Sequence, residues 1–290
     1  MKTKFYLTTA SVSVAAAMLF MASPASAQER CDLNGTDAGN NAADADSGAS
    51  STGTDALACG KNTVANQAGG VAIGTGAQAS GPSTTNPIFA SVAVGNAAVA
   101  VDNAVAIGNQ TVARFGGTAT PPNVGANSAV GVGAYAVAIG ANTVAIGTTA
   151  RAGTGFTINS PGSQVNAGNN ITVVGGRAEA NQNDATAIGA NSEISGERGT
   201  ALGSQTQVSQ AGGIAIGFGA IAQGPSTTNP IFASTAIGHN ALGVDNAVAI
   251  GNNAIARFGG TANPTPTGVN SSTVIGANAA AVGANNVAIG

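Results

Sequence analysis

Charged and aromatic residues are scarce in this chain of 290 residues. Asp, Glu, Lys and Arg make up 7% of the sequence, and aromatic residues make up 3%, with no Trp. In an ordinary soluble domain, charged side chains are about a quarter of the residues. A conventional core of large apolar side chains is therefore excluded. Two solutions remain, namely a disordered low-complexity chain or a repeat whose small residues let its layers stack closely.

The residues that build most catalytic and metal sites are also missing. The single histidine, His239, has no carboxylate cluster nearby, so neither a metal site nor a catalytic triad can be assembled. Serine and threonine are abundant but lack a base that would activate them. Glycine recurs without the regular aspartate of calcium-binding β-roll repeats. We expect no enzyme activity, no metal and no cofactor, and we interpret His239 as a variable turn residue.

The N-terminal segment 1–27 has the features of a secretory signal peptide. Lys2 and Lys4 precede an apolar run, and an Ala-Ser-Ala cleavage site ends at Ala27. Removal of residues 1–27 leaves 9 − 2 = 7 basic residues against 12 acidic ones, a net charge of −5. This balance provides no basic footprint for nucleic acid or an anionic membrane. We expect an exported chain with no nucleic-acid partner and no segment inserted in a membrane.

Short phrases of the type VAIG, each ending in glycine, recur along most of the chain. Gly175, Gly189, Gly203 and Gly217 show the basic 14-residue period, and most other gaps between these glycines are simple fractions or multiples of it. A disordered chain has no reason to keep these glycines at a constant spacing, so we reject disorder for the repeat region. A coiled coil is also excluded, because glycine in every heptad costs about 1 kcal/mol against alanine and the flanking charges of a zipper are absent.

The phrases fit short β-strands. Val and Ile favour strands, and glycine permits the positive-φ corner that follows. Between VAIG phrases stands a second type, such as Ala77-Gln78-Ala79, which predicts a strand with one buried and one wet face. The VAIG strand is apolar on both faces. We expect the side chain at its isoleucine position to point into the coil. We expect another copy of the chain to cover the opposite face. The pattern predicts a parallel β-solenoid with two strands per 14-residue coil.

On these alternating phrases, the chain resembles the head domain of YadA-like trimeric autotransporter adhesins over residues 56–290. The resemblance implies a left-handed parallel β-roll in a homotrimer. It also implies a place on the bacterial cell surface or outer membrane and binding to host matrix or cell-surface ligands. No neck motif, heptad stalk or C-terminal barrel anchor is found in the sequence, which we interpret as that of a partial product.

A long internal duplication interrupts the regular repeat in matching places. Residues 69–147 align without gaps with residues 212–290, and GPSTTNPIFAS is identical in both copies. Proline cannot serve a central strand ladder, so the proline-containing stretches predict projecting loops. We expect these loops near residues 81–91, 114–128, 153–170, 224–234 and 257–271.

Four side chains on these loops are candidate ligand contacts, because binding residues are concentrated on loops. They are Phe89, Arg114 and their counterparts Phe232 and Arg257. The alternative is structural: each Phe fills a coil corner, and each Arg caps the chain or pairs with a nearby aspartate. The sequence leaves both open.

The two cysteines bear on the N-terminal end of the solenoid. Cys59 lies in the isoleucine slot of the first clear coil, and Cys31 stands two nominal coils earlier in the sequence. Two regular coils would separate their Cα atoms by about 9.6 Å, beyond the roughly 7 Å limit of a disulfide. We therefore predict that residues 28–55 form an irregular acidic cap, folded back so that Cys31 and Cys59 form a bridge.

Together these features predict an adhesin head that attaches bacteria to host matrix, cells or abiotic surfaces through many weak contacts. The alternative is a structural spacer or matrix protein without a receptor, and an ice-binding solenoid fits less well. In VAIGANTVAIG at residues 137–147, a second strand that is apolar on both faces replaces the one-sided type. The same replacement ends the second copy, in AAVGANNVAIG at residues 280–290. We expect the tightest contact between chains there.

Overall fold

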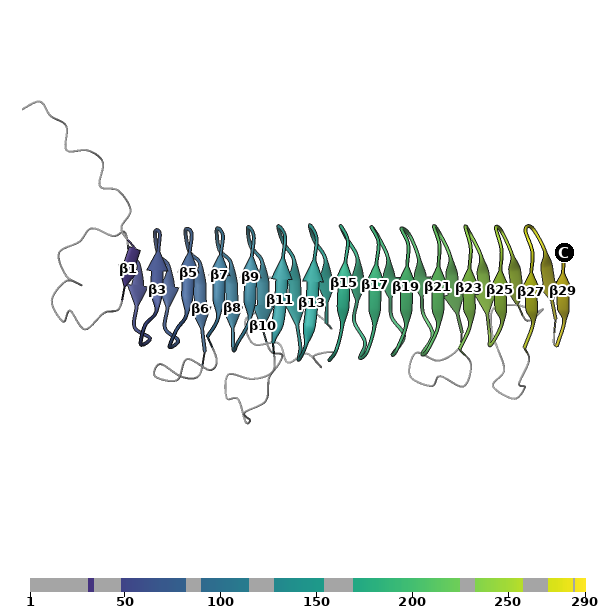
Figure 1. Cartoon of the computed structure of the whole chain (residues 1–290), viewed down its shortest axis with the longest axis horizontal. Coiled ribbons are helices and arrows are strands. Elements are labelled where there is room, and N and C mark those ends of the chain that lie inside the picture. Colours follow the sequence, from purple (N-terminus) through teal and green to yellow (C-terminus); the bar gives the residue numbers. More distant parts are fainter. Residues whose placement is uncertain are drawn as a thin grey trace, which may run out of the picture.

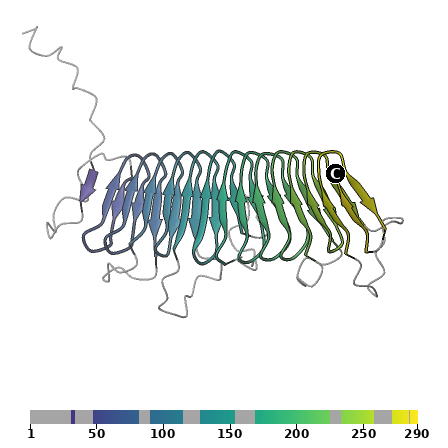
Figure 2. The ribbon, with the colours of Figure 1, turned by 45° about the vertical axis from the view of Figure 1, so that its right-hand side comes forward.

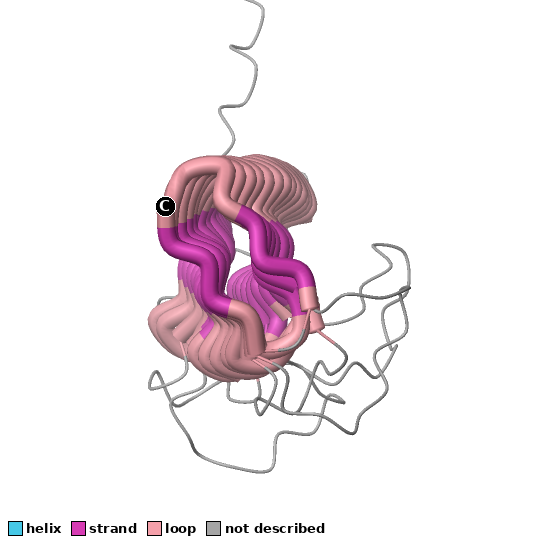
Figure 3. The backbone as a smooth tube through the Cα atoms, turned by 90° about the vertical axis from the view of Figure 1, so that its right-hand side faces the viewer, coloured by secondary structure: helices cyan, strands magenta, loops and turns pink. Residues whose placement is uncertain are grey.

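The computed structural model shows a straight solenoid of short strands (Figure 1). It describes residues 31–33, 48–81, 90–114, 128–153, 169–224, 233–257, 271–283 and 285–290. In end view, two sheets face each other and turns close the coil at both ends (Figure 3). The predicted signal peptide lies outside the described residues. The all-β architecture with two strands per coil is confirmed.

Each coil contributes one strand to each sheet, so the sheets hold alternate strands of the chain. The 15-stranded sheet, here sheet A, consists of β1 (Cys31–Leu33), β3 (Leu57–Cys59), β5 (Val71–Ile73), β7 (Val92–Val94), β9 (Val105–Ile107), β11 (Ala129–Val132), β13 (Thr143–Ile146), β15 (Thr172–Val174), β17 (Thr186–Ile188), β19 (Thr200–Leu202), β21 (Ile214–Ile216), β23 (Thr235–Ile237), β25 (Val248–Ile250), β27 (Thr273–Ile275) and β29 (Val287–Ile289). The 14-stranded sheet B consists of β2 (Ser50–Ser51), β4 (Val64–Ala65), β6 (Gln78–Ser80), β8 (Val99–Val101), β10 (Val112–Arg114), β12 (Val137–Ile139), β14 (Arg151–Ala152), β16 (Glu179–Ala180), β18 (Glu193–Ile194), β20 (Gln207–Val208), β22 (Ile221–Gln223), β24 (Leu242–Val244), β26 (Ile255–Arg257) and β28 (Ala280–Val282).

The parallel ladder stays in register where the chain carries extra residues. Leu57 pairs with Val71 across a regular 14-residue coil, and Val71 pairs with Val92 across a 21-residue one. The three-residue strand of each VAIG phrase, here the VAI motif, therefore pairs in the same register with that of the next coil, whatever the length of chain between the two strands. The predicted loops fall largely on residues 82–89, 115–127, 154–168, 225–232 and 258–270, which, with Phe89 and Phe232, lie outside the described residues.

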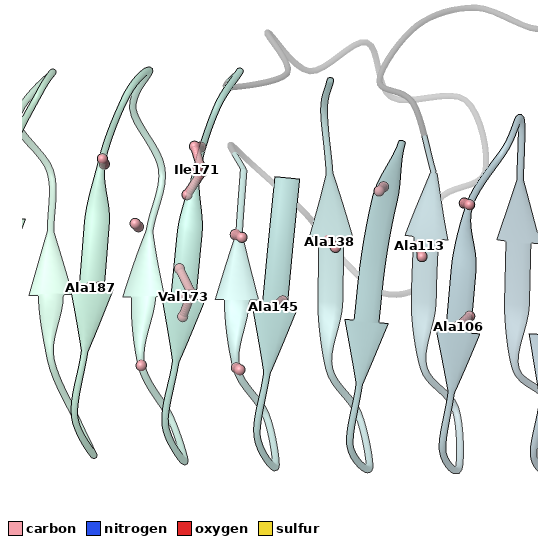
Figure 4. Close-up of a cluster of buried hydrophobic side chains, with 14 of the residues drawn as sticks. Ala106, Ala113, Ala138, Ala145, Ile171, Val173 and Ala187 are labelled. Carbon is pink, nitrogen blue, oxygen red and sulfur yellow. The ribbon is translucent and has the colours of Figure 1, made fainter. Parts of the chain in front are cut away.

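The core is a stack of alanines, and the prediction that isoleucine points inward is wrong. In β9, Ala106 is fully buried whereas Ile107 is 41% exposed. A Cβ placed on Gly131 of sheet A would lie 3.6 Å from the Cβ of Ala113 in sheet B. The inward positions of the two sheets thus meet at methyl contact distance, and most coils have room only for alanine (Figure 4). Val and Ile share the opposite side of the pleat and face outward.

The two copies of the duplication place the larger of two neighbouring core side chains at different positions. In the first copy, Thr111 is buried beside Gly131, where an added Cβ would come within 3.0 Å of the Thr111 Cγ2. The aligned residues of the second copy are Ala254 and Val274, both fully buried. A larger residue in the strand is thus matched by a smaller one in the turn, as close packing requires.

The glycine that ends each VAIG phrase is required by the distance between coils. Gly95 has a φ of 135°, and a Cβ there would lie 2.3 Å from the carbonyl oxygen of Gly108 in the next coil. Two residues later the chain adopts a left-handed conformation, as at Ala97 with a φ of 51°. These corners line up in rows along the solenoid (Figure 2).

Two coils have 13 residues, one fewer than the regular 14-residue coil, and an Asp-Asn turn accounts for each. Asp102 and Asn103 both have left-handed φ values, 59° and 60°, as do Asp245 and Asn246. Two consecutive left-handed residues make a tighter corner than the usual one. Partial burial in this corner raises the pKa of both the Asp102 and the Asp245 carboxyl groups.

At the N-terminal end, β1 runs antiparallel to β3, with Cys31 opposite Cys59 in the ladder. Cys59 is disulfide-bonded, and Cys31 is the only other cysteine of the sequence. The expected boundary at residue 56 is wrong, because β2 (Ser50–Ser51) already pairs in parallel with β4. Regular pairing in sheet B therefore begins inside the segment predicted to be an irregular cap.

Candidate functional site

The outer face of sheet A is a continuous aliphatic stripe. From β3 to β29, the first and third residues of each VAI motif face outward, and all are Val, Ile, Leu or Thr except Cys59. The large side chains that remain more than a third exposed along its length are Ile73, Ile107, Ile146, Ile188, Ile250, Ile275 and, in the last strand, Val287 and Ile289. At a strand spacing of about 4.8 Å, the stripe is about 60 Å long. Monomeric soluble proteins rarely expose apolar patches of such extent.

The outer face of sheet B is polar at its centre. Arg151, Glu179, Glu193 and Gln207 stand in register on four successive strands and point away from the alanine core. The two faces of the solenoid therefore differ in chemistry. Sheet A offers an aliphatic surface without charge along its length, whereas sheet B presents charges and amides from β14 to β20 and carries outward Val, Ile and Leu in strands such as β8, β22 and β24.

The strand β12 bears on the prediction for residues 137–147. It stands in sheet B where other coils have a one-sided strand, in register with β10 and β14. Its outward residues Val137 and Ile139 are only 6% and 1% exposed. Because these side chains are already buried within the chain, they leave almost no area for a second chain. This burial argues against β12 itself as a contact between chains, whereas Ile146 in β13 and Val282 in β28, which belong to the same stretches of the two copies, are 39% and 49% exposed. The place of the tightest contact between chains stays a prediction.

The two candidate arginines belong to the solenoid and not to the projecting loops. Arg114 is the last residue of β10 and Arg257 the last of β26, so both occupy the outer face of sheet B. The loop boundaries expected at 114 and 257 are therefore one residue early. Nothing in these positions distinguishes a binding role from a structural one, and their role as ligand contacts stays a proposal.

His239 lies in the turn after β23, as predicted, and its ring stacks on that of Phe218. The two ring centroids are 5.4 Å apart and the planes differ by 13°. Sequence reasoning missed this pair because its members belong to different phrases of the repeat, with an inserted loop between them. The signal was present, since each residue directly follows the final glycine of its phrase and such residues come together in successive coils.

No group of three or more His, Cys, Asp or Glu residues that could hold a metal ion occurs within the described ranges. In the same ranges, no helix is long and apolar enough to cross a membrane.

Comparison with known proteins gives one match. The family model described as the YadA head domain repeat, in two copies, matches residues 51–77, 69–85, 172–192, 195–228 and 245–257. These segments coincide with coils whose two strands and glycine corner are described above. No curated protein and no solved structure matches the chain.

Proposed function

This chain is a YadA-like head domain of a trimeric autotransporter adhesin, and we propose that it attaches bacteria to host matrix, host cells or abiotic surfaces. The family is one of non-enzymatic adhesin domains and implies a secreted cell-surface protein. In this proposal, export depends on the signal peptide of residues 1–27, and the head is displayed at the bacterial cell surface.

The observation that carries the proposal is the aliphatic stripe of sheet A. A stripe without charge from β3 to β29 would be unfavourable in water, and a second and third copy of the same chain offer a matching surface. We propose that three left-handed β-rolls pack around a common axis with this face inward. Sheet B would then face solvent, in agreement with its charged centre.

Such a trimer would bind by repetition. Three chains, each with many similar coils, present the same weak contacts several times, and linked weak contacts raise the overall affinity by orders of magnitude. The Cys31–Cys59 bridge proposed here would hold β1 against the first coil. It would thus keep β1 paired with β3, the first strand of the parallel ladder, whose outward backbone groups would otherwise be unpaired.

The trimer is tested by native mass measurement of the secreted chain and of two lysine variants. We expect a trimer for the wild type. Ile188→Lys, on the stripe, would place three ammonium groups around the axis and is expected to give monomers. Gln207→Lys, on sheet B, should remain trimeric. A stable wild-type monomer, or an unaffected Ile188→Lys trimer, would contradict this arrangement.

Attachment is tested separately, by solid-phase binding of the trimer to immobilised collagen, fibronectin and laminin, to host cells and to plastic. Saturable binding to at least one of these surfaces is expected. If a well-formed trimer binds none of them, the chain serves as a spacer and the adhesin proposal is wrong.

A further inference from the structure

The residues that directly follow the corner glycines form a row on one edge of the solenoid. Hydrogen bonds between coils hold this row: Gly219 N–H donates to the carbonyl of Ser204 at 3.0 Å, Asn240 N–H to that of Phe218 at 2.8 Å, and Asn253 N–H to that of His239 at 2.8 Å. Ser204, Phe218 and His239 therefore stand in successive coils. We call this edge the corner ridge.

The corner ridge carries an exposed aromatic pair in a chain with very few aromatics. Phe218 is 46% exposed, and its ring stacks on the exposed His239 ring. The aligned residues of the first copy are Thr75 and Asn96. Because the same coils form there without rings, the pair is not required by the fold. The pair therefore offers an exposed aromatic surface in the second copy that the first copy lacks.

His239 stands in the coil that follows Phe218 and stacks on one face of its ring. The coil on the other side is that of Ser204, whose hydroxyl donates to the carbonyl of Ala190 at 2.9 Å. Gln205 directly follows Ser204, and its N–H donates to the same Ala190 carbonyl at 2.9 Å, which places Asn191 one coil earlier in the same row. Both amide residues are exposed. The exposed aromatic pair thus adjoins a polar surface made by a hydroxyl and two amide residues.

Two further properties of the ridge define the ligand. The ridge positions Ala190, Ser204, Phe218, His239 and Asn252 carry no Asp, Glu, Lys or Arg. The surface directly beside the rings thus suits an uncharged molecule, and the nearest cation on this edge is the exposed Arg177, one coil before Asn191. The backbone N–H groups of Gly219, Asn240 and Asn253 already bond to neighbouring coils. A peptide therefore cannot pair with the ridge through its main chain, which is how extended peptides usually bind strands. Recognition must come from the ring and the amide side chains.

We propose that the Phe218–His239 pair and the adjoining amides bind a neutral glycan. The C–H groups on one side of a sugar ring are slightly positive and are attracted to the negative face of an aromatic ring. The hydroxyls of the same sugar donate to and accept from Gln205 and Asn191, whose amides offer both kinds of group. This inference rests on the adhesin function proposed above and assigns a ligand class to one of its contacts.

The test uses the trimeric secreted chain on a printed array of neutral and sialylated oligosaccharides. Phe218→Thr with His239→Asn installs the residues of the first copy, which the same coil geometry already accommodates. Thr75→Ser with Asn96→Gln is the matched control on the ridge of the first copy. We expect the wild type and the control to bind a subset of neutral glycans, and the F218T/H239N variant to bind at least tenfold more weakly.

The outcomes separate this inference from the adhesin function. If the wild type attaches to matrix proteins or cells but binds no neutral glycan on the array, the glycan proposal is wrong and the adhesin proposal stands. Unchanged glycan binding by the F218T/H239N variant, or binding confined to sialylated glycans, also overturns it. Circular dichroism and native mass of the variant establish that any loss comes from the site and not from unfolding.

Discussion

The substitution Gly95→Ala tests how closely the coils approach each other. At a φ of 135°, an L-residue is held in a region that costs about 1–3 kcal/mol. The added methyl would lie 2.3 Å from the Gly108 carbonyl oxygen and 2.6 Å from its carbon. Since these are backbone atoms of the next coil, no side chain can move aside, and overpacking adds about 1–3 kcal/mol. We expect a total loss of about 4 kcal/mol in the free energy of unfolding, the sum of backbone strain and overpacking.

Urea unfolding followed by circular dichroism, at one fixed trimer concentration, measures this loss. With a slope of about 2 kcal/mol per molar urea, the midpoint falls by about 2 M. The control is Ala97→Gly in the same corner. It relieves a left-handed alanine, worth about 1 kcal/mol, at a similar entropic cost in the unfolded chain, so little change is expected. A Gly95→Ala midpoint within about 0.5 M of the wild type would refute the close stacking of the corner glycines.

Three further substitutions test the core, the Asp-Asn corner and the disulfide. Gly131→Val alone should lower the free energy of unfolding in urea by about 1–3 kcal/mol, whereas the double variant with Thr111→Ala should regain most of that loss. Equal losses in the single and the double variant would contradict the proposed compensation between the two core positions. Burial raises the pKa of Asp102, so the folded chain holds that proton more tightly than the unfolded chain, and stability falls as pH rises through the raised pKa. Asp102→Asn should therefore raise the thermal midpoint at about pH 7 and leave it unchanged at about pH 3, where the carboxyl is mostly protonated in both states; the opposite pH dependence would refute this reasoning. Cys59→Ser, which removes the proposed bridge to Cys31, should cost about 3–4 kcal/mol, and an unchanged unfolding midpoint would show that the bridge contributes nothing.

Several features of the fold could be predicted because they depend on short stretches of chain. The alternation in Ala77-Gln78-Ala79 predicts one buried and one wet face, and both alanines are fully buried while Gln78 is exposed. The glycine after each VAI motif predicts a positive-φ corner, and Gly95 and Gly108 have this conformation. Each of these properties arises within a single coil.

The direction of the VAI strand could not be predicted in the same way. Both of its faces are apolar, so the alternation alone allows either Ala106 or Ile107 to point inward. The width of the interior decides, and that width depends on how closely the facing sheet approaches, which is a property of two strands and not of one.

The sequence by itself therefore determined the coil: its length, its two strands and its corners, because glycine, Val and Ile act locally on the backbone. The tertiary structure decided what the coils present to their surroundings. It directed the isoleucines outward into one long aliphatic stripe, and it buried Val137 and Ile139 within the chain. It also brought Phe218 and His239 together, because stacking juxtaposes equivalent positions of successive coils whatever length of chain separates them.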